Sequence, residues 1–337
     1  MDFLITILNF LQSHWLILAF AAPMSWALVN LIDVYFVGKV YQDELDGTII
    51  AGLFQILPWT VLIFFLKIDM GQFINLGGGG NSFWVDPILF TALVGGFLFA
   101  SSFYFYFKTL FSHNDVSLLQ IIWSLTIVAV PVFSFLFWGE ILSFYQYLGM
   151  VVILLGAAML SLSKGLKAKI SSRYIWLMLG AVIFLSLSMV FEEKVYSDLA
   201  ARGLGNQGFL VGLLFFSIGA FLAGLFFAIV GKRNPLPLIK KYLKILLILE
   251  GLSALGNFAS QAAINAAPSV SFVAAVETFV PVFILLFSAL ILFGFTYILI
   301  LKKDKQVIKK IYQEQLNGVW VKVIATIIMV AGVYIMT

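Results

Sequence analysis

The chain has 337 residues, of which 62% are hydrophobic and only 11% are charged, and its mean hydropathy is +1.08. Soluble globular domains contain about 45–50% apolar and about 25% charged residues, so the composition excludes a soluble fold. The absence of cysteine excludes disulfides, thiolate metal sites and cysteine nucleophiles, and two histidines, His14 and His113, do not suffice for a histidine-built metal centre. The net charge of +4 does not indicate nucleic-acid binding, because the basic residues lie between long hydrophobic runs.

Ten hydrophobic runs follow one another along the chain, each close to the length of about 20 residues that a helix needs to cross the hydrocarbon core. A transmembrane barrel would show alternating segments of about ten residues instead. We therefore predict an all-α integral membrane protein with ten transmembrane helices, preceded by an interfacial lead-in over residues 1–14. The predicted spans lie near residues 15–37, 49–66, 87–107, 117–138, 142–163, 174–195, 208–231, 243–265, 271–299 and 319–336.

The two halves of the chain share short motifs. Val130–Phe133 in the fourth run has the same sequence as Val280–Phe283 in the ninth, and Gly156 in the fifth run corresponds to Gly332 in the tenth. Five spans are an odd number, so a second copy must enter the membrane from the opposite side, as in the inverted repeats of many secondary transporters. The predicted units are a first repeat (15–163), a basic linker (164–173) and a second repeat (174–337) with an insertion (302–317).

The distribution of basic residues predicts the orientation. All but three of the 20 Lys and Arg residues lie in or beside the odd-numbered loops, and the exceptions are Lys67, Lys194 and Arg202. Cytoplasmic loops near span ends carry an excess of Lys and Arg. The odd-numbered loops are therefore expected in the cytoplasm and both termini outside.

Several motifs resemble those of a known family. The stretch Ser117–Thr126, followed by Pro131, Gly139-Glu140 and Gln146 to Gly156, looks like the second half of an EamA-type repeat in the drug/metabolite transporter superfamily, and Trp26–Asp33 is similar to the first helix of its ten-span members. The resemblance implies two inverted five-helix repeats that move small organic molecules by alternating access. This chain departs from the pattern at Leu290, which stands where Glu140 would map, and in the insertion. Members of the superfamily have been drawn with cytoplasmic termini, whereas the charge distribution here places them outside.

Three acidic residues within or near the end of a span are candidates for coupling or binding. An ionisable group at mid-membrane costs at least about 2.5–3.5 kcal/mol on insertion scales, so it is expected to face a cavity or a partner. Glu277 lies deep in the ninth run, and its counterpart Ile127 is apolar, which favours a proton-binding or cation-binding role; the alternative is a structural acid bonded to a neighbouring helix. Asp33 and Glu193 form a pseudo-symmetric pair when the two repeats are aligned, whereas Glu192 is expected to belong to a charged cluster with Lys194 at the water boundary.

Other polar and aromatic residues are candidates to line a cavity. Trp26, Asn30 and Asp33 follow i, i+4, i+7 spacing and share one helical face. In the eighth run, polar residues also recur on one face, although Asn and Gln in spans equally bond helices together. The first of them, Glu250, lies nearer the basic loop 232–244 and is expected to pair with it. The remaining candidates are Gln55, Trp59, Tyr104, Tyr106, Gln120, Trp123, Asn257, Gln261 and Asn265, with Pro131 and Pro281 as candidate hinges.

These residues predict a secondary transporter for a small organic metabolite, such as an amino acid or a related compound, in a prokaryotic plasma membrane. No motif for ATP binding or hydrolysis is found, so we expect no enzyme and no cofactor, and coupling to a proton or to the substrate's own gradient. The expected partners are the substrate and the lipid bilayer, and not nucleic acid; the oligomeric state is left open. Two alternatives remain at this point: a lipid-carrier flippase, and a non-transporting scaffold in which the polar residues only bond helices together.

Overall fold

The computed structural model describes residues 14–57, 73–75, 84–112, 123–162, 172–294 and 318–337. Within these residues the only strands are β1 (Ile74–Asn75) and β2 (Trp84–Val85), which pair antiparallel over two residues. The helices are α2 (Trp15–Lys39), α3 (Glu44–Phe54), α5 (Pro87–Ser112), α7 (Thr126–Trp138), α8 (Phe144–Leu162), α9 (Ser172–Ala201), α10 (Gly205–Val230), α11 (Leu236–Ala266), α12 (Val270–Glu277), α13 (Val280–Gly294) and α15 (Val319–Met336).

Seven segments of the described residues are long and apolar enough to cross a membrane, which confirms a multi-pass, all-helical membrane protein. Thr126–Trp138 of α7 and Phe144–Leu160 of α8 are shorter apolar segments. The predicted basic linker and lead-in fall almost wholly outside the described residues, and so do the insertion 302–317 and parts of the second and fourth predicted spans. The seven segments are Trp15–Asp33, Pro87–Ser112, Tyr174–Ala201, Gln207–Val230, Leu236–Ala266, Val270–Leu290 and Val319–Met336.

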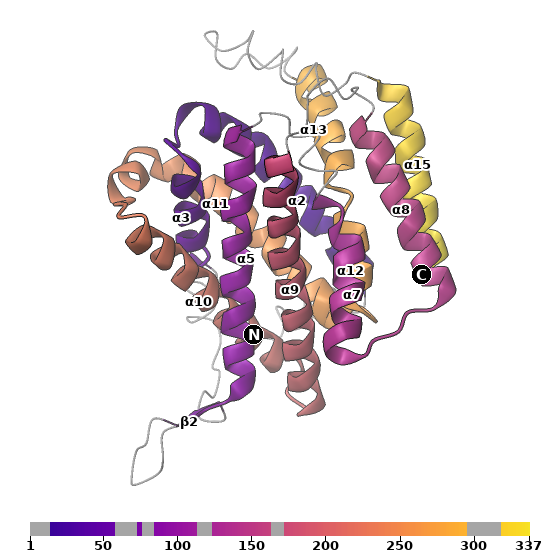
Figure 1. Ribbon diagram of the computed structural model, residues 1–337, viewed down its shortest axis with the longest axis horizontal. Helices are drawn as coiled ribbons and strands as arrows, with labels where there is room; N and C mark the ends of the chain where they lie inside the picture. Colours follow the sequence, from indigo (N-terminus) through magenta and orange to yellow (C-terminus); the bar gives the residue numbers. More distant parts are fainter. Residues whose placement is uncertain (1–13, 58–72, 76–83, 113–122, 163–171, 295–317) are drawn as a thin grey trace.

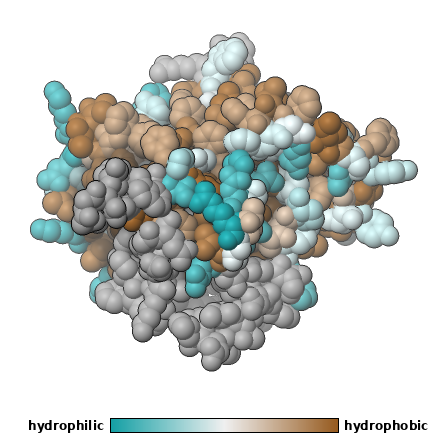
Figure 2. Space-filling view, turned by 90° about the horizontal axis from the view of Figure 1, so that it is seen from below, coloured by the Kyte–Doolittle hydropathy of each residue, from teal (hydrophilic) through white to brown (hydrophobic). Residues whose placement is uncertain are grey.

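The helices pack into one bundle, and most of them run from one end of the molecule toward the other (Figure 1). The outward faces carry exposed apolar side chains such as Leu136, Leu155 and Trp320, as contact with lipid requires. Figure 2 looks at the end where β2 lies, and shows a group of hydrophilic side chains near the middle of this end face among apolar ones.

Small residues allow the closest helix contacts. A Cβ atom on Gly96 of α5 would overlap the carbonyl oxygen of Phe216 of α10, and one on Gly219 of α10 would overlap the carbonyl oxygen of Leu93. At the edge of the bundle, α8 and α15 lie side by side (Figure 1), and a Cβ atom on Gly149 would lie 2.6 Å from the carbonyl oxygen of Gly332. Close backbone approach at small residues is a common mode of association in membranes, where apolar burial gives no advantage over lipid.

The contact at Gly96 yields a prediction with a neighbouring control. Gly96→Ala forces α5 and α10 apart, and overpacking of this kind typically costs about 1–3 kcal/mol. A Cβ atom on the adjacent Gly95 would meet its nearest atom at 3.6 Å, an ordinary contact, so Gly95→Ala should keep the stability of the parent protein. The midpoints of thermal unfolding in detergent check this. Equal midpoints for the two variants would contradict the described packing of α5 on α10.

Candidate functional site: a central cavity and an acidic chamber

A cavity of about 60 Å³ lies in the middle of the bundle, and we call it the central cavity. Its walls come from α2, α5, α9, α11 and α13, and from Trp123, which lies three residues before the start of α7. Helices from both halves of the chain therefore contribute. The lining residues are Trp26, Val29, Asn30, Asp33, Phe99, Phe103, Tyr106, Trp123, Leu185, Ser253 and Val280.

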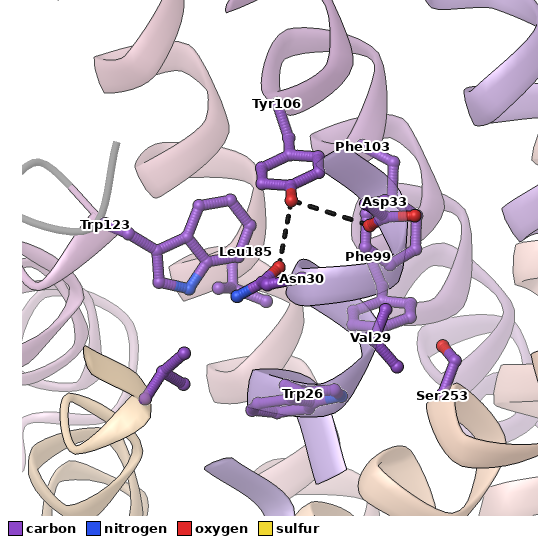
Figure 3. A pocket seen from close by; sticks show the side chains of 11 residues that line it. Trp26, Val29, Asn30, Asp33, Phe99, Phe103, Tyr106, Trp123, Leu185 and Ser253 are labelled. Atoms are coloured by element: carbon purple, nitrogen blue, oxygen red, sulfur yellow. Dashed lines mark hydrogen bonds between the residues drawn. The ribbon is translucent and has the colours of Figure 1, made fainter. Parts of the chain in front are cut away.

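One hydroxyl group links the polar side chains of the central cavity. The Tyr106 hydroxyl donates to Asn30 Oδ1 at 2.9 Å and lies 3.5 Å from Asp33 Oδ2, as Figure 3 shows. A hydroxyl carries a single hydrogen, so the shorter bond to Asn30 is the principal one. The Asp33 carboxylate, only 5% exposed, has this long contact as its one hydrogen bond within the described part of the chain.

Five aromatic rings line the same cavity as this carboxylate. The rings of Tyr106 and Trp123 meet edge to face with centroids 5.7 Å apart, and those of Phe99 and Phe103 do so at 4.9 Å. Figure 3 shows Trp26 on the same side of α2 as Asn30 and Asp33, so all five rings face one space. The central cavity thus combines a buried acid with aromatic walls.

A second, smaller cavity of about 10 Å³ lies beside the first, and we call it the acidic chamber. Trp26, Phe99 and Leu185 line both spaces and therefore separate them. The chamber holds two buried carboxylates, those of Glu192 and Glu277. Its other lining residues are Met189, Phe216, Asn257, Ser260 and Gln261.

Each chamber carboxylate accepts one hydrogen bond from a serine. Ser260 Oγ donates to Glu277 Oε1 at 2.5 Å, and Ser188 Oγ, one turn earlier on α9, donates to Glu192 Oε1 at 3.0 Å. The Tyr196 hydroxyl donates to Gln261 Oε1. Glu192 is 5% exposed and faces the chamber, so its predicted place in a charged cluster at the water boundary is wrong.

Trp26, one of the residues between the two spaces, is held in place by the side-chain amides of Asn257 and Gln55. The indole Nε1 of Trp26 donates to Asn257 Oδ1 at 3.3 Å, and Asn257 Nδ2 donates to Gln55 Oε1 at 2.8 Å. Gly256 makes room for the ring, because a Cβ atom there would lie 2.7 Å from the Trp26 Nε1. Gln55 acts on the cavity through Asn257, as it is not among the lining residues.

Glu193 occupies a position different from that of its neighbour. Its Oε1 accepts the backbone N–H of Val270 at 2.9 Å, at the first turn of α12, where Ser269 also accepts the N–H of Ser271. A carboxylate at a helix N-terminus satisfies a free donor and interacts favourably with the helix dipole. The chain then turns at Thr278, between α12 and α13, and Pro281 lacks the N–H that would bond the carbonyl of Glu277.

The other candidates lie in several environments. Pro131 lies within α7 and lines an apolar groove against α8. Tyr104 is on the opposite face of α5 from Tyr106, where its hydroxyl accepts from Lys108 at 2.6 Å and its ring stacks on Phe227, so it lines neither cavity. Asn265 is partly buried near the end of α11 and lines neither cavity, while Trp59 and Gln120 lie outside the described residues.

The position of Glu250 corrects another expectation. It is buried, 4% exposed, and forms no ion pair within the described part of the chain, rather than pairing with the basic loop before α11. The basic stretch 232–244 continues into α11, where its last basic residue, Lys244, lies six residues before Glu250. Six residues are about 9 Å along the helix axis and do not share a helical face, so Glu250 does not pair with that stretch.

An ion pair lies at the end of the bundle where α5 begins and α9 ends. Arg202 donates two hydrogen bonds to the Asp86 carboxylate, the longer from Nη2 to Oδ1 at 3.3 Å. These bonds hold the pKa of Asp86 below its usual value, because they stabilise the charged form. Beside this pair, Lys194 contacts Asp198 at 2.5 Å and lies over the ring of Trp138. These contacts tie together the ends of α5, α7 and α9.

Comparisons with known proteins agree with this fold without naming a family. No protein-family model matches the chain, and no curated protein does. One of the solved structures that match is described only as "Crystal structure of protein". It is 16% identical to this chain and has a TM-score of 0.61, and the match covers 96% of each of the two chains. At this identity the likeness concerns the fold alone. The protein is therefore a multi-span, all-helical membrane protein with the fold of a solved structure.

The access of water to the cavity is testable, because the chain has no native cysteine. Asn30→Cys should react with a small, charged methanethiosulfonate reagent, since the side chain lines the central cavity. Ala27→Cys on the same helix is the control: Ala27 is fully buried in an apolar cluster and should not react. Labelling followed by mass spectrometry measures both. An unreactive cysteine at position 30 would favour a role for the polar residues in helix association alone.

Proposed function

We propose that the protein is a secondary transporter that moves a small organic metabolite across the plasma membrane by alternating access. The observation that carries the proposal is the central cavity, where helices from both halves of the chain surround buried polar side chains. Polar residues at membrane depth generally face a pathway, a partner or a cavity. An all-helical bundle with a binding site at the interface of two halves is the usual architecture of such transporters.

The packing pattern supports an inverted repeat. Exchanging the two halves maps α2 onto α9, α5 onto α11, α7 onto α12 and α13, and α8 onto α15. The packing of α5 on α9 then corresponds to that of α11 on α2, and the packing of α7 on α9 to that of α13 on α2; each of these contacts occurs. Helices α8 and α15, which are mates, pack on each other. In the proposed cycle the two repeats rock about the central cavity.

The acidic chamber is the proposed site of proton coupling. Burial disfavours the charged form of a carboxylate, and Glu277 and Glu192 are both buried against a space about large enough for one water molecule. Glu277 also adjoins the break between α12 and α13, so a change in its charge acts where the helix has lost a backbone hydrogen bond. Trp26 lies between the chamber and the central cavity and would transmit that change.

Uptake into proteoliposomes tests the function. Purified protein should accelerate the entry of at least one solute from a panel of amino acids, nucleosides, sugars and cationic compounds, relative to protein-free vesicles. The Trp26→Ala variant should reduce that uptake, because it removes the partition between the two spaces. The absence of uptake for the whole panel would contradict the proposal and would favour the scaffold.

The coupling role of Glu277 predicts a specific defect. Glu277→Gln imitates the neutral acid and keeps a group that can bond Ser260, so the fold and solute binding should persist while the dependence of uptake on a pH gradient is lost. Asp198→Asn, which alters an acid outside the chamber, should retain that dependence. Uptake is measured with and without an imposed pH gradient. Gradient-driven uptake by the Gln variant at the parent rate would remove Glu277 from the mechanism.

A further inference from the structure

Two buried acids, Asp33 of α2 and Glu250 of α11, have no basic partner among the residues that the structure describes, and Asp33 lines the central cavity. Asp33 is 5% exposed and Glu250 is 4% exposed. The four ion pairs found within the described residues involve neither of them. Uncompensated buried charge is costly, so such groups are generally neutral or paired. The central cavity can therefore accept a positive charge at Asp33.

The hydrogen bonding of Asp33 leaves its carboxylate able to bind a positively charged group. The contact of its Oδ2 with the Tyr106 hydroxyl is 3.5 Å long, and the same hydroxyl makes its better bond to Asn30. Interactions of this length are weak. The carboxylate lines the cavity, as Figure 3 shows, so a ligand there can contact it directly.

The remaining walls also match a cation. Trp26, Trp123, Tyr106, Phe99 and Phe103 line the cavity, and no Lys, Arg or His is among the described lining residues of this cavity or of the acidic chamber. The faces of aromatic rings attract a cation, most strongly when it is desolvated, and Trp is the best of them. An anionic ligand would be repelled by the acids of the two spaces, which are Asp33, Glu192 and Glu277, and no described lining residue would neutralise its charge.

We propose that the central cavity binds a small organic cation, an amine or quaternary ammonium compound, with Asp33 as its counter-charge and the rings of Trp26, Trp123 and Tyr106 around it. The inference rests on the proposed transport function and names its substrate class. A metal ion is a poorer match, because the described residues bring no three acidic, histidine or cysteine side chains together as metal ligands and the walls are mostly apolar. An aromatic cage with one carboxylate fits an organic monocation.

Binding of matched probes tests the substrate class. Choline and tyramine are titrated into the purified protein by calorimetry, each beside a neutral analogue of similar shape, 3,3-dimethyl-1-butanol and 4-ethylphenol. At least one cation should bind at least about tenfold more tightly than its neutral analogue, because only the cation gains from the carboxylate and the rings. Equal affinity within both pairs, or binding of neither cation, would overturn the inference.

Variants assign the binding to the cavity. Asp33→Asn should weaken cation binding about tenfold or more while it leaves the side-chain shape, and Trp123→Leu should weaken it about tenfold through loss of a ring face. Glu44→Gln, which changes an acid paired with Lys108 outside the cavity, should leave the affinity unchanged. Asp33→Glu should restore part of it, which separates a counter-charge from a need for this residue in folding. Unchanged affinity in both cavity variants would overturn the inference.

The outcomes separate this inference from the proposed function. If the protein transports a neutral metabolite in proteoliposomes and binds neither cation, the cation site is wrong and the transporter stands. If choline or tyramine binds through Asp33 but no solute of the uptake panel is transported, the site stands as a binding site and the transport function is wrong. If no solute is transported and neither cation binds, both are wrong.

Discussion

Within the hydrocarbon core of a membrane, a polar side chain has no water to bond, so it must face another protein group or an enclosed space. This constraint places Asp33, Asn257, Glu192 and Glu277 in the interior of the bundle, while the outward faces of the helices remain apolar. These polar side chains form two groups. They gather on the two sides of Trp26, whose indole divides the central cavity from the acidic chamber. The proposed transport mechanism depends on this division.

Glycines make the division possible. Gly256 leaves the space that the Trp26 ring occupies, and Gly96 and Gly219 let α5 and α10 approach closely enough to enclose the interior. Larger residues would move whole helices, because packed interiors adjust little to added volume. The close approach of the α5 and α10 backbones therefore helps to enclose the acidic chamber, which Phe216 of α10 lines, and rotation of the helices about these contacts would change its width.

Much of the architecture follows from the sequence, because long apolar runs permit few alternatives to spanning helices. The i, i+4, i+7 spacing also predicts that Trp26, Asn30 and Asp33 share a face, and all three line one cavity. Spacing within one helix cannot decide which face of that helix points inward. For this reason the sequence does not distinguish Tyr104 from Tyr106, and it is the packing of α5 that places the Tyr104 ring on Phe227 of α10, away from the central cavity.

The spacing of residues within one helix also cannot predict which distant segments contact each other. Glu192 and Glu193 are adjacent, so they project about 100° apart on α9; one enters the acidic chamber and the other caps α12. The bond between Gln55 and Asn257 joins residues 202 positions apart, and no local pattern indicates it. The sequence thus identifies the polar residues, while their partners depend on how the helices are rotated in the bundle.

Distances between the two ends of α2 and α9 test the central claim of alternating access most directly. These helices belong to opposite halves, and spin labels can be placed at one end on Lys39 and Trp176 and at the other on Ile17 and Ala200, all of which are exposed. Pulsed electron paramagnetic resonance in proteoliposomes should give two distances for each pair. Acidification or added solute should shift the two pairs in opposite directions, one end opening as the other closes. A single, unchanged distance at both ends under all conditions would contradict the account.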